Sequence, residues 1–565
     1  MNLFSKIISP YNVIFNVLLV LMAIGLTFPA ILHINQLAMG DGGDNYQYVG
    51  FQYVAHVLFS HGYFPFTWTN LWRYPAGINF QLAFDSSFFI MIGVFLYQFS
   101  QNPILIYNLS MLVALYCNLV LSYISFRVWF DKTTAFIGTI IYGASFYTIA
   151  RLAGHANLML SATIPFFFAS IWLFYKRKDL ISIGYIGIAI LLLLSSSLEY
   201  PLILIGGLIF GSPILYLFYP NEMNKLLQLG FKKIILLIII VCLAVGIFSI
   251  VQGEKLLSIF NNSVQLPYQG LQYVESINFF TPNNYVYNLS GIIANPTGRG
   301  IEKASVFFGY TELLLFVIAL YYLRRKRITL ALGSIFIIYF IIAQGVQTQL
   351  SSIWPYQYLF LEPPFRDIVE PGRFFLIFYF VSTILILLFI KHIKSKKIII
   401  VILLLLIIER IPINFPIRGY PTENFIPIVQ KSDSNAVLDL PIFTDWWNGP
   451  LYDYYSILYQ KPIVNGYIHW SGNTPNAKYF TDSLNSFSCY SGASTQIDKS
   501  DAELMKNQLI TQLKQNNIKT VVIHKDIYHF PECTKAAYYI QTLTQDNQVW
   551  KILFQDDKTI VLWLQ

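Results

Sequence analysis

Two carboxylates stand close together at the end of the first apolar run of this 565-residue chain. Asp41 and Asp44 lie in the segment GDGGD, whose glycines permit tight backbone turns close to a bound ligand. A carboxylate that is partly shielded from bulk water can have a raised pKa and act as a general base. The pair is therefore a candidate catalytic site, and the alternative is a hydrophilic turn that ends the first helix.

Arginines provide a second kind of chemistry. Arg366 and Arg373 lie in the segment EPPFRDIVEPGRF, at the start of an apolar run. Guanidinium groups bind phosphate oxygens bidentately and keep their charge, so these two are the strongest phosphate-binding candidates. The alternative is a pair of internal salt bridges to Asp367 or Glu370.

A short polar segment, RLAGHAN, separates two other apolar runs. Arg151 is a candidate phosphate ligand, and His155 suits a phosphate or a hydroxyl group. Asn157 completes this polar set. The alternative is an anchor at the membrane interface.

Two further acids, Glu199 and Glu312, lie within or beside apolar runs. An acid inside a membrane is costly and usually faces a cavity or a partner. Both are therefore candidates for lining a substrate pocket, and the alternative for Glu312 is a structural pair with an arginine. The polar segment 253–304, rich in Asn, Tyr, Pro and Gly, is long enough to serve as a binding lid, and the alternative is packing on the membrane surface.

The composition indicates which elements must position these groups. Hydrophobic residues make up 55% of the chain and charged residues only 12%, against roughly 25% in an average soluble domain. The net charge of +8 comes from lysines and arginines at the ends of apolar runs, as in membrane anchors, and gives no indication of nucleic-acid binding. The chain has no phosphate-loop, CxxC or HExxH motif.

A membrane-spanning helix needs about 20 apolar residues. Eleven spans are predicted, at about 12–33, 104–126, 133–150, 158–175, 181–198, 201–219, 234–252, 305–323, 328–344, 373–390 and 398–412. The apolar stretch from Ile181 to Phe218 is too long for one helix. Because proline interrupts a helix and a charge resists burial, Glu199-Tyr-Pro is expected to split it.

The segment 86–98 decides the predicted topology. Its apolar core is too short to span, so it is expected to lie at the interface within a first outer loop, residues 34–103. The lysines and arginines then gather on the inner side, as the positive-inside rule requires. Only Arg73, Arg151, Lys255, Arg299, Lys303, Arg366 and Arg373 fall on the outer side before the last span. In this orientation the N-terminus is cytoplasmic. The expected location is the plasma (inner) membrane.

Residues 419–565 are ordinary in composition and too long for a loop. The runs AVLDLPIF, KPIVNGY, IKTVVIH and TIVLWL, with the helical pattern AELMKNQLITQLKQNN before IKTVVIH, predict a small extracytoplasmic α/β domain. Cys489 and Cys533 lie in this part, and a disulfide between them is an open alternative if the domain faces an oxidising compartment.

The predicted fold is thus an α-helical polytopic membrane module, residues 1–418, followed by an α/β domain, residues 419–565. With an acidic first outer loop, an interfacial helix after it and an outer C-terminal domain, the chain resembles the GT-C superfamily of integral membrane glycosyltransferases. The segments that carry the resemblance are GDGGDNYQYVGFQYVAH, YPAGINF, RLAGHAN, FFGYTELLL, PFRDIVEPGRF, VLDLPIF and KPIVNGY. They are similar to a bacterial branch that uses polyprenyl-phosphate sugars, distantly like enzymes that glycosylate cell-wall polymers.

The resemblance implies a reaction and roles. Asp44 is the first choice for the base that deprotonates an acceptor hydroxyl, and Asp41 is the second choice or a metal ligand. Arg366, Arg373 and Arg151 would hold the donor phosphate. The pocket residues would be His155, Asn157, Glu199, Glu312, Tyr74 and Asn79. The acceptor would be an extracytoplasmic glycan, lipid or protein.

No cofactor is assigned from the sequence. Some members of the superfamily use a second acidic motif and a divalent cation, but the second outer loop here contains no acid, so no metal ligand is assigned. Two other functions remain open: a transporter or flippase of lipid-linked saccharides, and a catalytically inactive relative that binds glycan.

Overall fold

The computed structural model describes residues 10–40, 44–227, 231–260, 276–282, 287–288, 305–344, 370–419, 423–443, 449–466, 487–489, 499–525 and 533–565. By its internal contacts the chain divides into two compact units. The first, called the membrane unit, comprises residues 1–41, 85–92 and 104–418. The second unit comprises residues 42–84, 93–103 and 419–565.

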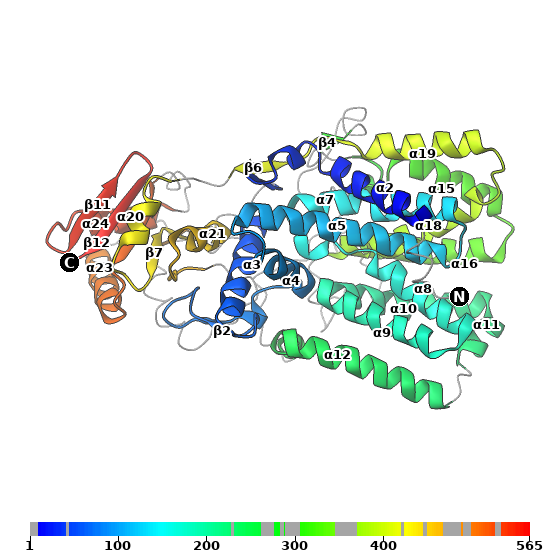
Figure 1. Ribbon diagram of the computed structural model, residues 1–565, viewed down its shortest axis with the longest axis horizontal. Coiled ribbons are helices and arrows are strands. Elements are labelled where there is room, and N and C mark those ends of the chain that lie inside the picture. The colour runs from blue at the N-terminus through cyan, green and yellow to red at the C-terminus, as the bar shows by residue number, and fades with distance from the viewer. Residues whose placement is uncertain are drawn as a thin grey trace. The chain divides into compact units, whose positions relative to one another are not determined.

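The membrane unit is a bundle of helices that run side by side (Figure 1). Its longer helices are α2 (Pro10–Leu26), α5 (Pro103–Arg127), α6 (Lys132–Gly138), α7 (Phe146–Gly154), α8 (Thr163–Arg177), α9 (Leu180–Ser196), α10 (Glu199–Phe218), α11 (Pro220–Leu227), α12 (Phe231–Phe260), α15 (Tyr310–Leu323), α16 (Arg327–Ala343), α18 (Phe375–Ile390) and α19 (Lys396–Arg410). The short elements are η1 (Ala30–His33), the π-helix η3 (Thr139–Gly143), η4 (Ala156–Leu158), η5 (Ser276–Phe279), η8 (Pro371–Phe374), β1 (Leu37–Met39), β4 (Tyr287–Asn288), β5 (Pro412–Asn414) and β6 (Ile417–Gly419). Strand β1 pairs with β6, and β4 pairs with β5.

Within the described residues, five helices are long and apolar enough to cross a membrane, or six if one bent pair counts as a single span. The bent pair is Lys132–Gly143 and Phe146–Gly154, which meet at 44°. Further apolar helices of 10–17 residues lie at other predicted spans, so the chain is built as a membrane protein while the count of eleven spans stays a prediction.

Helix boundaries confirm the predicted break in the long apolar stretch and show that the segment predicted to lie at the interface is short, while its place at the interface stays a prediction. Helix α9 ends at Ser196 and α10 begins at Glu199, so the long apolar stretch breaks where the charge and Pro201 stand. Helix α4 (Ser87–Leu96) has only 10 residues. At 1.5 Å per residue it is about 15 Å long, half the thickness of a hydrocarbon core of about 30 Å.

The helices of the bundle differ in how far they are enclosed. Helix α18 lies at the centre, and the aromatic rings of η5, of α16 and of Phe308, just before α15, pack against its Phe375, Phe378 and Tyr379. Helix α12 lies at the edge of the bundle beside α9 (Figure 1). Most of its apolar surface is exposed, as expected for a helix that faces lipid.

The second unit contains a four-stranded sheet in the order β11-β12-β10-β7. Its strands are β7 (Val437–Leu440), β10 (Thr520–His524), β11 (Trp550–Gln555) and β12 (Thr559–Leu564). Strands β10 and β7 are parallel, whereas β12 runs antiparallel to both of its neighbours. Helices α20 (Ile426–Lys431), α21 (Gly449–Tyr459), α23 (Lys499–Gln515) and α24 (Thr534–Thr544) complete this part of the unit.

The apolar runs of the C-terminal region predicted most of this sheet. VLDL forms β7, TVVIH forms β10 and TIVLWL forms β12, and the helix predicted before IKTVVIH is α23. KPIVNGY contributes only an isolated bridge between Ile463 and Val437. Strand β11 has no counterpart among the predicted segments.

Part of the predicted first outer loop packs against the C-terminal residues of the second unit. It forms α3 (Asp44–Ser60), β2 (Trp68–Thr69), β3 (Ile78–Asn79) and η2 (Phe80–Leu82). The indole of Trp72 is fully buried and donates to the Ser456 hydroxyl at 3.0 Å. Backbone bonds from Ile463 N to Leu71 O (2.9 Å) and from Tyr74 N to Ile463 O (3.0 Å) join the two segments.

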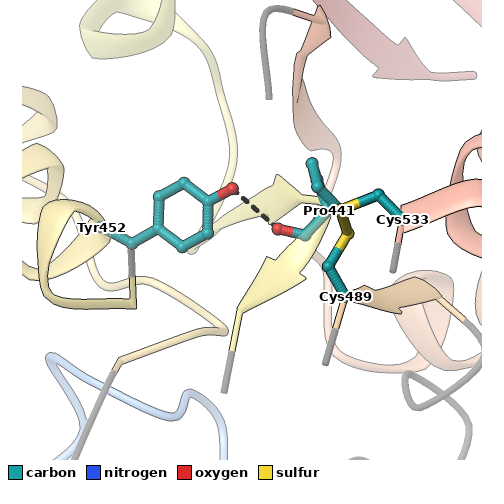
Figure 2. The surroundings of a disulfide bond; sticks show 4 residues. All are labelled: Pro441, Tyr452, Cys489 and Cys533. Carbon is teal, nitrogen blue, oxygen red and sulfur yellow. Dashed lines mark hydrogen bonds between the residues drawn. A yellow bond between two sulfur atoms is a disulfide. The ribbon is translucent and has the colours of Figure 1, made fainter. Parts of the chain in front are cut away.

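A disulfide joins Cys489 and Cys533, so the pairing left open by the sequence is formed. Cys489 lies on β9 (Ser488–Cys489), which pairs in parallel with β8 (Ile442–Phe443). Figure 2 shows the sulfur bridge beside Pro441, whose carbonyl accepts a hydrogen bond from the Tyr452 hydroxyl at 2.7 Å. The bridge therefore ties β9, the strand that pairs with β8, to the start of α24.

Candidate functional site

The backbone that leads to the two aspartates is fixed by side chains of the membrane unit. Asn108 of α5 donates to the carbonyls of Ile34 and Leu37 and accepts from Met39 N at 2.9 Å. Gly40 has a φ of 108°, a left-handed conformation that favours glycine, and its N–H donates to the Pro416 carbonyl. Asp41 follows directly but lies outside the described residues.

Asp44 is the first residue of α3 in the second unit and is partly buried. A negative charge at a helix N-terminus is stabilised by the helix dipole. Tyr74 and Asn79 belong to the same unit. The Tyr74 hydroxyl accepts a 3.4 Å hydrogen bond from Asn435, and the Asn79 side chain caps η2 by accepting from Gln81 N at 3.1 Å.

Arg151 is fully buried at the end of α7, just beyond the bend that follows the π-helix η3. Its guanidinium lies 4.6 Å from the centre of the Tyr147 ring and donates to the Ser305 hydroxyl at 3.0 Å. A second donor, Nη1, lies 3.2 Å from Nδ1 of His155. Because a guanidinium can only donate, this contact makes Nδ1 of His155 the acceptor.

Arg373 and Glu199, which are 174 residues apart, form an ion pair between η8 and the first residue of α10. The side chains keep 10% and 12% of their surface exposed, so one edge of the pair is open. Arg373 forms a salt bridge with Glu199, and its backbone N–H donates to the carbonyl of Glu370. Arg366 lies outside the described residues.

A second ion pair joins Asp85, just before α4, to Lys255 near the end of α12. The other oxygen of Asp85 accepts from Nδ2 of Asn157 at 3.2 Å. Since a carboxylate only accepts, this bond fixes the orientation of the Asn157 amide and leaves its Oδ1 pointing elsewhere. The lysine side chain is only 1% exposed, while that of Asp85 is 16% exposed.

The two ion pairs belong to one cluster of charges. The Glu199 carboxylate lies near enough to Lys255 to interact with it electrostatically. The next residue, Tyr200, interacts with Arg151 and donates to the carbonyl of Leu158 in η4. This charge cluster draws on α7, η4, α10, α12, η8 and the residue stretch just before α4. Its members are Asp85, Arg151, Asn157, Glu199, Lys255 and Arg373.

Glu312 lies elsewhere, inside the bundle. It is fully buried, forms an ion pair with Arg410 of α19 and accepts from the Tyr379 hydroxyl of α18. These contacts support the structural alternative for this residue, a buried pair with an arginine.

Two members of the charge cluster were not among the residues assigned from the sequence: Asp85 and Lys255. Their contact spans 170 residues, and no spacing rule connects them. The one signal was the charge of Lys255 directly after a long apolar run, where a lysine normally reaches the aqueous interface.

The charge cluster contains carboxylates together with guanidinium and ammonium groups, so it is equipped to bind an anion. Among the described residues, no group of three or more His, Cys, Asp or Glu side chains could hold a metal ion. In chemical terms, the guanidiniums can hold phosphate oxygens, while the acids can orient these cations or accept protons.

The fold of this chain is similar to that of a solved glycosyltransferase structure, which agrees, at the level of fold, with the resemblance predicted from the sequence. The arabinofuranosyltransferase AftD from Mycobacteria matches with a TM-score of 0.53 and 11% sequence identity, over 98% of this chain and 39% of AftD. The chain therefore spans about two fifths of the length of AftD.

Two other solved structures are similar at lower scores. The oligosaccharyltransferase AglB from Archaeoglobus fulgidus, in complex with an inhibitory peptide and a dolichol-phosphate, has a TM-score of 0.47 and 13% identity over 97% of this chain and 73% of AglB. ArnT from Cupriavidus metallidurans, bound to undecaprenyl phosphate, has a TM-score of 0.46 and 12% identity over 97% of both chains. No family model and no curated protein matches the sequence.

Proposed function

We propose that the protein is a membrane glycosyltransferase that moves a sugar from a polyprenyl-phosphate donor to an extracytoplasmic acceptor. The GT-C fold supports the class of enzyme. The observation that carries the proposal is the charge cluster of the membrane unit, in which Arg373 is held by Glu199 beside Lys255. A partly open cluster of cations among membrane helices suits the phosphate of a lipid-linked sugar.

The proposed reaction is a displacement with inversion at the anomeric carbon. Asp44 takes the proton of an acceptor hydroxyl, and the oxygen forms a bond to the anomeric carbon. The bond from that carbon to the phosphate oxygen breaks, and the electron pair leaves with the polyprenyl phosphate. Asp41 is the second choice for the base.

The arginines act on the leaving group. As the glycosidic bond breaks, negative charge grows on the phosphate, and cations that are already in place stabilise it more than they stabilise the ground state. In this proposal Arg373 and Arg366 bind the phosphate, with Arg151 as a third cation. His155 and Asn157 line the sugar pocket beside them.

The orientation and location in the cell are part of the proposal. The positive residues of the loops support a cytoplasmic N-terminus and an extracytoplasmic C-terminal region in the plasma (inner) membrane. Single cysteines introduced at Arg325 and at Asn516, in a background without Cys117 and Cys242, test this with a membrane-impermeant thiol reagent. We expect the reagent to label only the cysteine at position 516. If it labels only the cysteine at position 325, the proposed orientation is wrong and the protein has the opposite one.

The donor and the base are tested with purified protein supplied with polyprenyl-phosphate sugars. Asp44→Asn is expected to lower the rate of transfer by about 10²–10⁴-fold, the usual contribution of a general base, with donor binding retained. Asp179→Asn is the matched control, because Asp179 caps α9 and pairs with Arg177, and asparagine caps helices equally well. Unchanged transfer by both Asp44→Asn and Asp41→Asn would remove the base assignment.

The same assay separates the alternatives. A flippase would move the lipid-linked sugar across a vesicle membrane without forming a glycosidic bond. An inactive relative would bind the donor and show no transfer in the wild type.

A further inference from the structure

Helix α12 changes character at its end. Most of the helix is apolar and exposed at the edge of the bundle, where it contacts mainly α9. At Gln252 the backbone leaves the helical conformation, with φ −138° and ψ 29°, and the helix bends. Beyond the bend Lys255 is almost completely buried, and Gln252 at the bend is fully buried. After the bend, the Lys255 side chain therefore lies in the charge cluster, whereas most of α12 lies at the exposed edge of the bundle.

The carboxylate that receives this cation is itself held in place. Asp85 is followed by Ser86 and Ser87, whose hydroxyls both donate to the carbonyl of Ser195, near the end of α9. On its other side, Asn157 donates to Oδ2 of Asp85 while Lys255 donates to Oδ1. The acid is therefore anchored to α9, the same helix against which α12 packs.

Stability alone does not account for this ion pair. A buried ion pair is often no more stabilising than apolar side chains of the same size, and fixing a lysine side chain costs about 1.5–2 kcal/mol of rotamer freedom. The two partners are also unequally enclosed, since the acid keeps an exposed edge while the lysine does not. An anion that enters the cluster would meet this carboxylate at the exposed edge and would compete with it for the lysine.

We infer that Asp85 occupies the place of the donor phosphate at Lys255 until the donor arrives. In the free enzyme the ammonium is held by Asp85. When a lipid phosphate binds, the ammonium turns to a phosphate oxygen, which its flexible four-carbon stem permits, and Asn157 keeps Asp85 in position. Lys255 is thus a phosphate-binding residue and Asp85 a positioning residue. The inference rests on the proposed function, because it concerns the same donor site.

Binding measurements test the inference without reference to transfer. Undecaprenyl phosphate and the neutral lipid undecaprenol are titrated into the purified full chain. Lys255→Met is expected to weaken binding of the phosphate by about 10- to 100-fold, the loss of one charged hydrogen bond, and to leave undecaprenol binding unchanged. Lys233→Met, at the opposite end of α12, is the matched control and is expected to change neither.

Asp85→Asn gives the sharper result. Removing a carboxylate that competes for Lys255 is expected to tighten phosphate binding by about threefold or more, since a like charge close to the anion is also lost. A merely structural pair predicts the opposite, because Asp85→Asn would loosen the site. Weaker phosphate binding by Asp85→Asn, or equal binding by Lys255→Met and wild type, overturns the inference.

Two controls keep these outcomes distinct. The double variant Asp85→Asn/Lys255→Met leaves neither partner of the pair unpaired, so it is expected to fold, to bind undecaprenol like the wild type and to bind the phosphate more weakly than the wild type. Equal phosphate binding by the double variant and the wild type overturns the inference. If the wild type itself does not bind undecaprenyl phosphate better than undecaprenol, the proposed function fails together with the inference. Competition with inorganic phosphate shows whether the headgroup alone is recognised.

Discussion

The membrane unit contains two sets of buried ion pairs that look alike at first. In the first set Glu312 pairs with Arg410, and both side chains are at most 2% exposed. In the second set, the charge cluster, Asp85 pairs with Lys255 and Glu199 with Arg373, and three of the four side chains remain 10–16% exposed. The sets differ in what surrounds the charges.

Around Arg410 the protein supplies many partners. Its guanidinium donates to the carbonyls of Ala144 and Leu406 at 2.9 and 3.0 Å, and Tyr379 bonds both Glu312 and the Ile141 carbonyl. The carbonyls of Ile141 and Ala144 come from the π-helix η3 and its end, where the backbone leaves the regular helical pattern. This pair locks α15, α18 and α19 to the bend before α7.

The charge cluster is built from helix ends and keeps an open edge. Degree of burial alone therefore does not separate a structural ion pair from a binding site. The number of protein partners around the charges, and the presence of an accessible edge, are more informative.

The largest expected effect concerns the structural pair. Glu312→Ala leaves Arg410 buried without its counter-charge and is expected to cost about 3–5 kcal/mol of stability. Thermal unfolding in detergent measures the loss, and donor affinity of the folded fraction should be unchanged. The double change Glu312→Leu/Arg410→Leu should recover most of the stability, because apolar pairs replace buried ion pairs at little cost. If Glu312→Ala keeps its stability but no longer binds the donor, Glu312 belongs to the donor site instead.

The next effect concerns the charge cluster. Arg373→Ala is expected to weaken binding of undecaprenyl phosphate by about 1.5–3 kcal/mol, since one charged hydrogen bond is lost, and Arg366→Ala should do the same. Titration of the lipid measures the change. Arg177→Ala, which removes an arginine paired with Asp179 at the end of α8, is the control. Equal affinity combined with lower stability would make Arg373 a structural residue like Arg410.

The smallest expected effect concerns Tyr379, a hydrogen-bond partner of the Glu312–Arg410 pair. Tyr379→Phe removes the hydroxyl that bonds Glu312 and Ile141, and about 1 kcal/mol of stability should be lost. Donor binding should not change. Tyr321→Phe on the exposed face of α15 serves as the reference in the same unfolding assay. A drop in donor affinity for Tyr379→Phe would mean that the two sets are coupled.

The sequence predicted the parts of the fold that depend on local patterns. Apolar length placed the helices, and the charge and proline at Glu199 and Pro201 placed the break between α9 and α10. The short segment 86–98 became a short helix for the same reason. In the C-terminal region, apolar runs located β7, β10 and β12.

The candidate site was predicted only in part, because its contacts connect distant segments. The residue types of Glu199 and Arg373 made both of them candidates. Their pairing could not be predicted, because the two residues are 174 positions apart in the sequence. The sequence does not predict Asp85 and Lys255 as site residues, because each is a single charge beside an apolar run. The bend at Gln252 precedes the buried Lys255, and the neighbouring Gly253 gave only a weak local signal for it, because a single glycine is tolerated inside a helix.

The second unit is assembled from pieces that are far apart in the chain. Trp72 is buried against Ser456, and a Cβ added at Gly50 would lie 2.7 Å from the Trp72 ring and 3.1 Å from Asp453. Residues 419–565 expressed as a fragment would therefore expose the surface that residues 42–84 cover. A fragment that is meant to fold as this unit must therefore include helix α3, which begins at Asp44, together with residues 419–565.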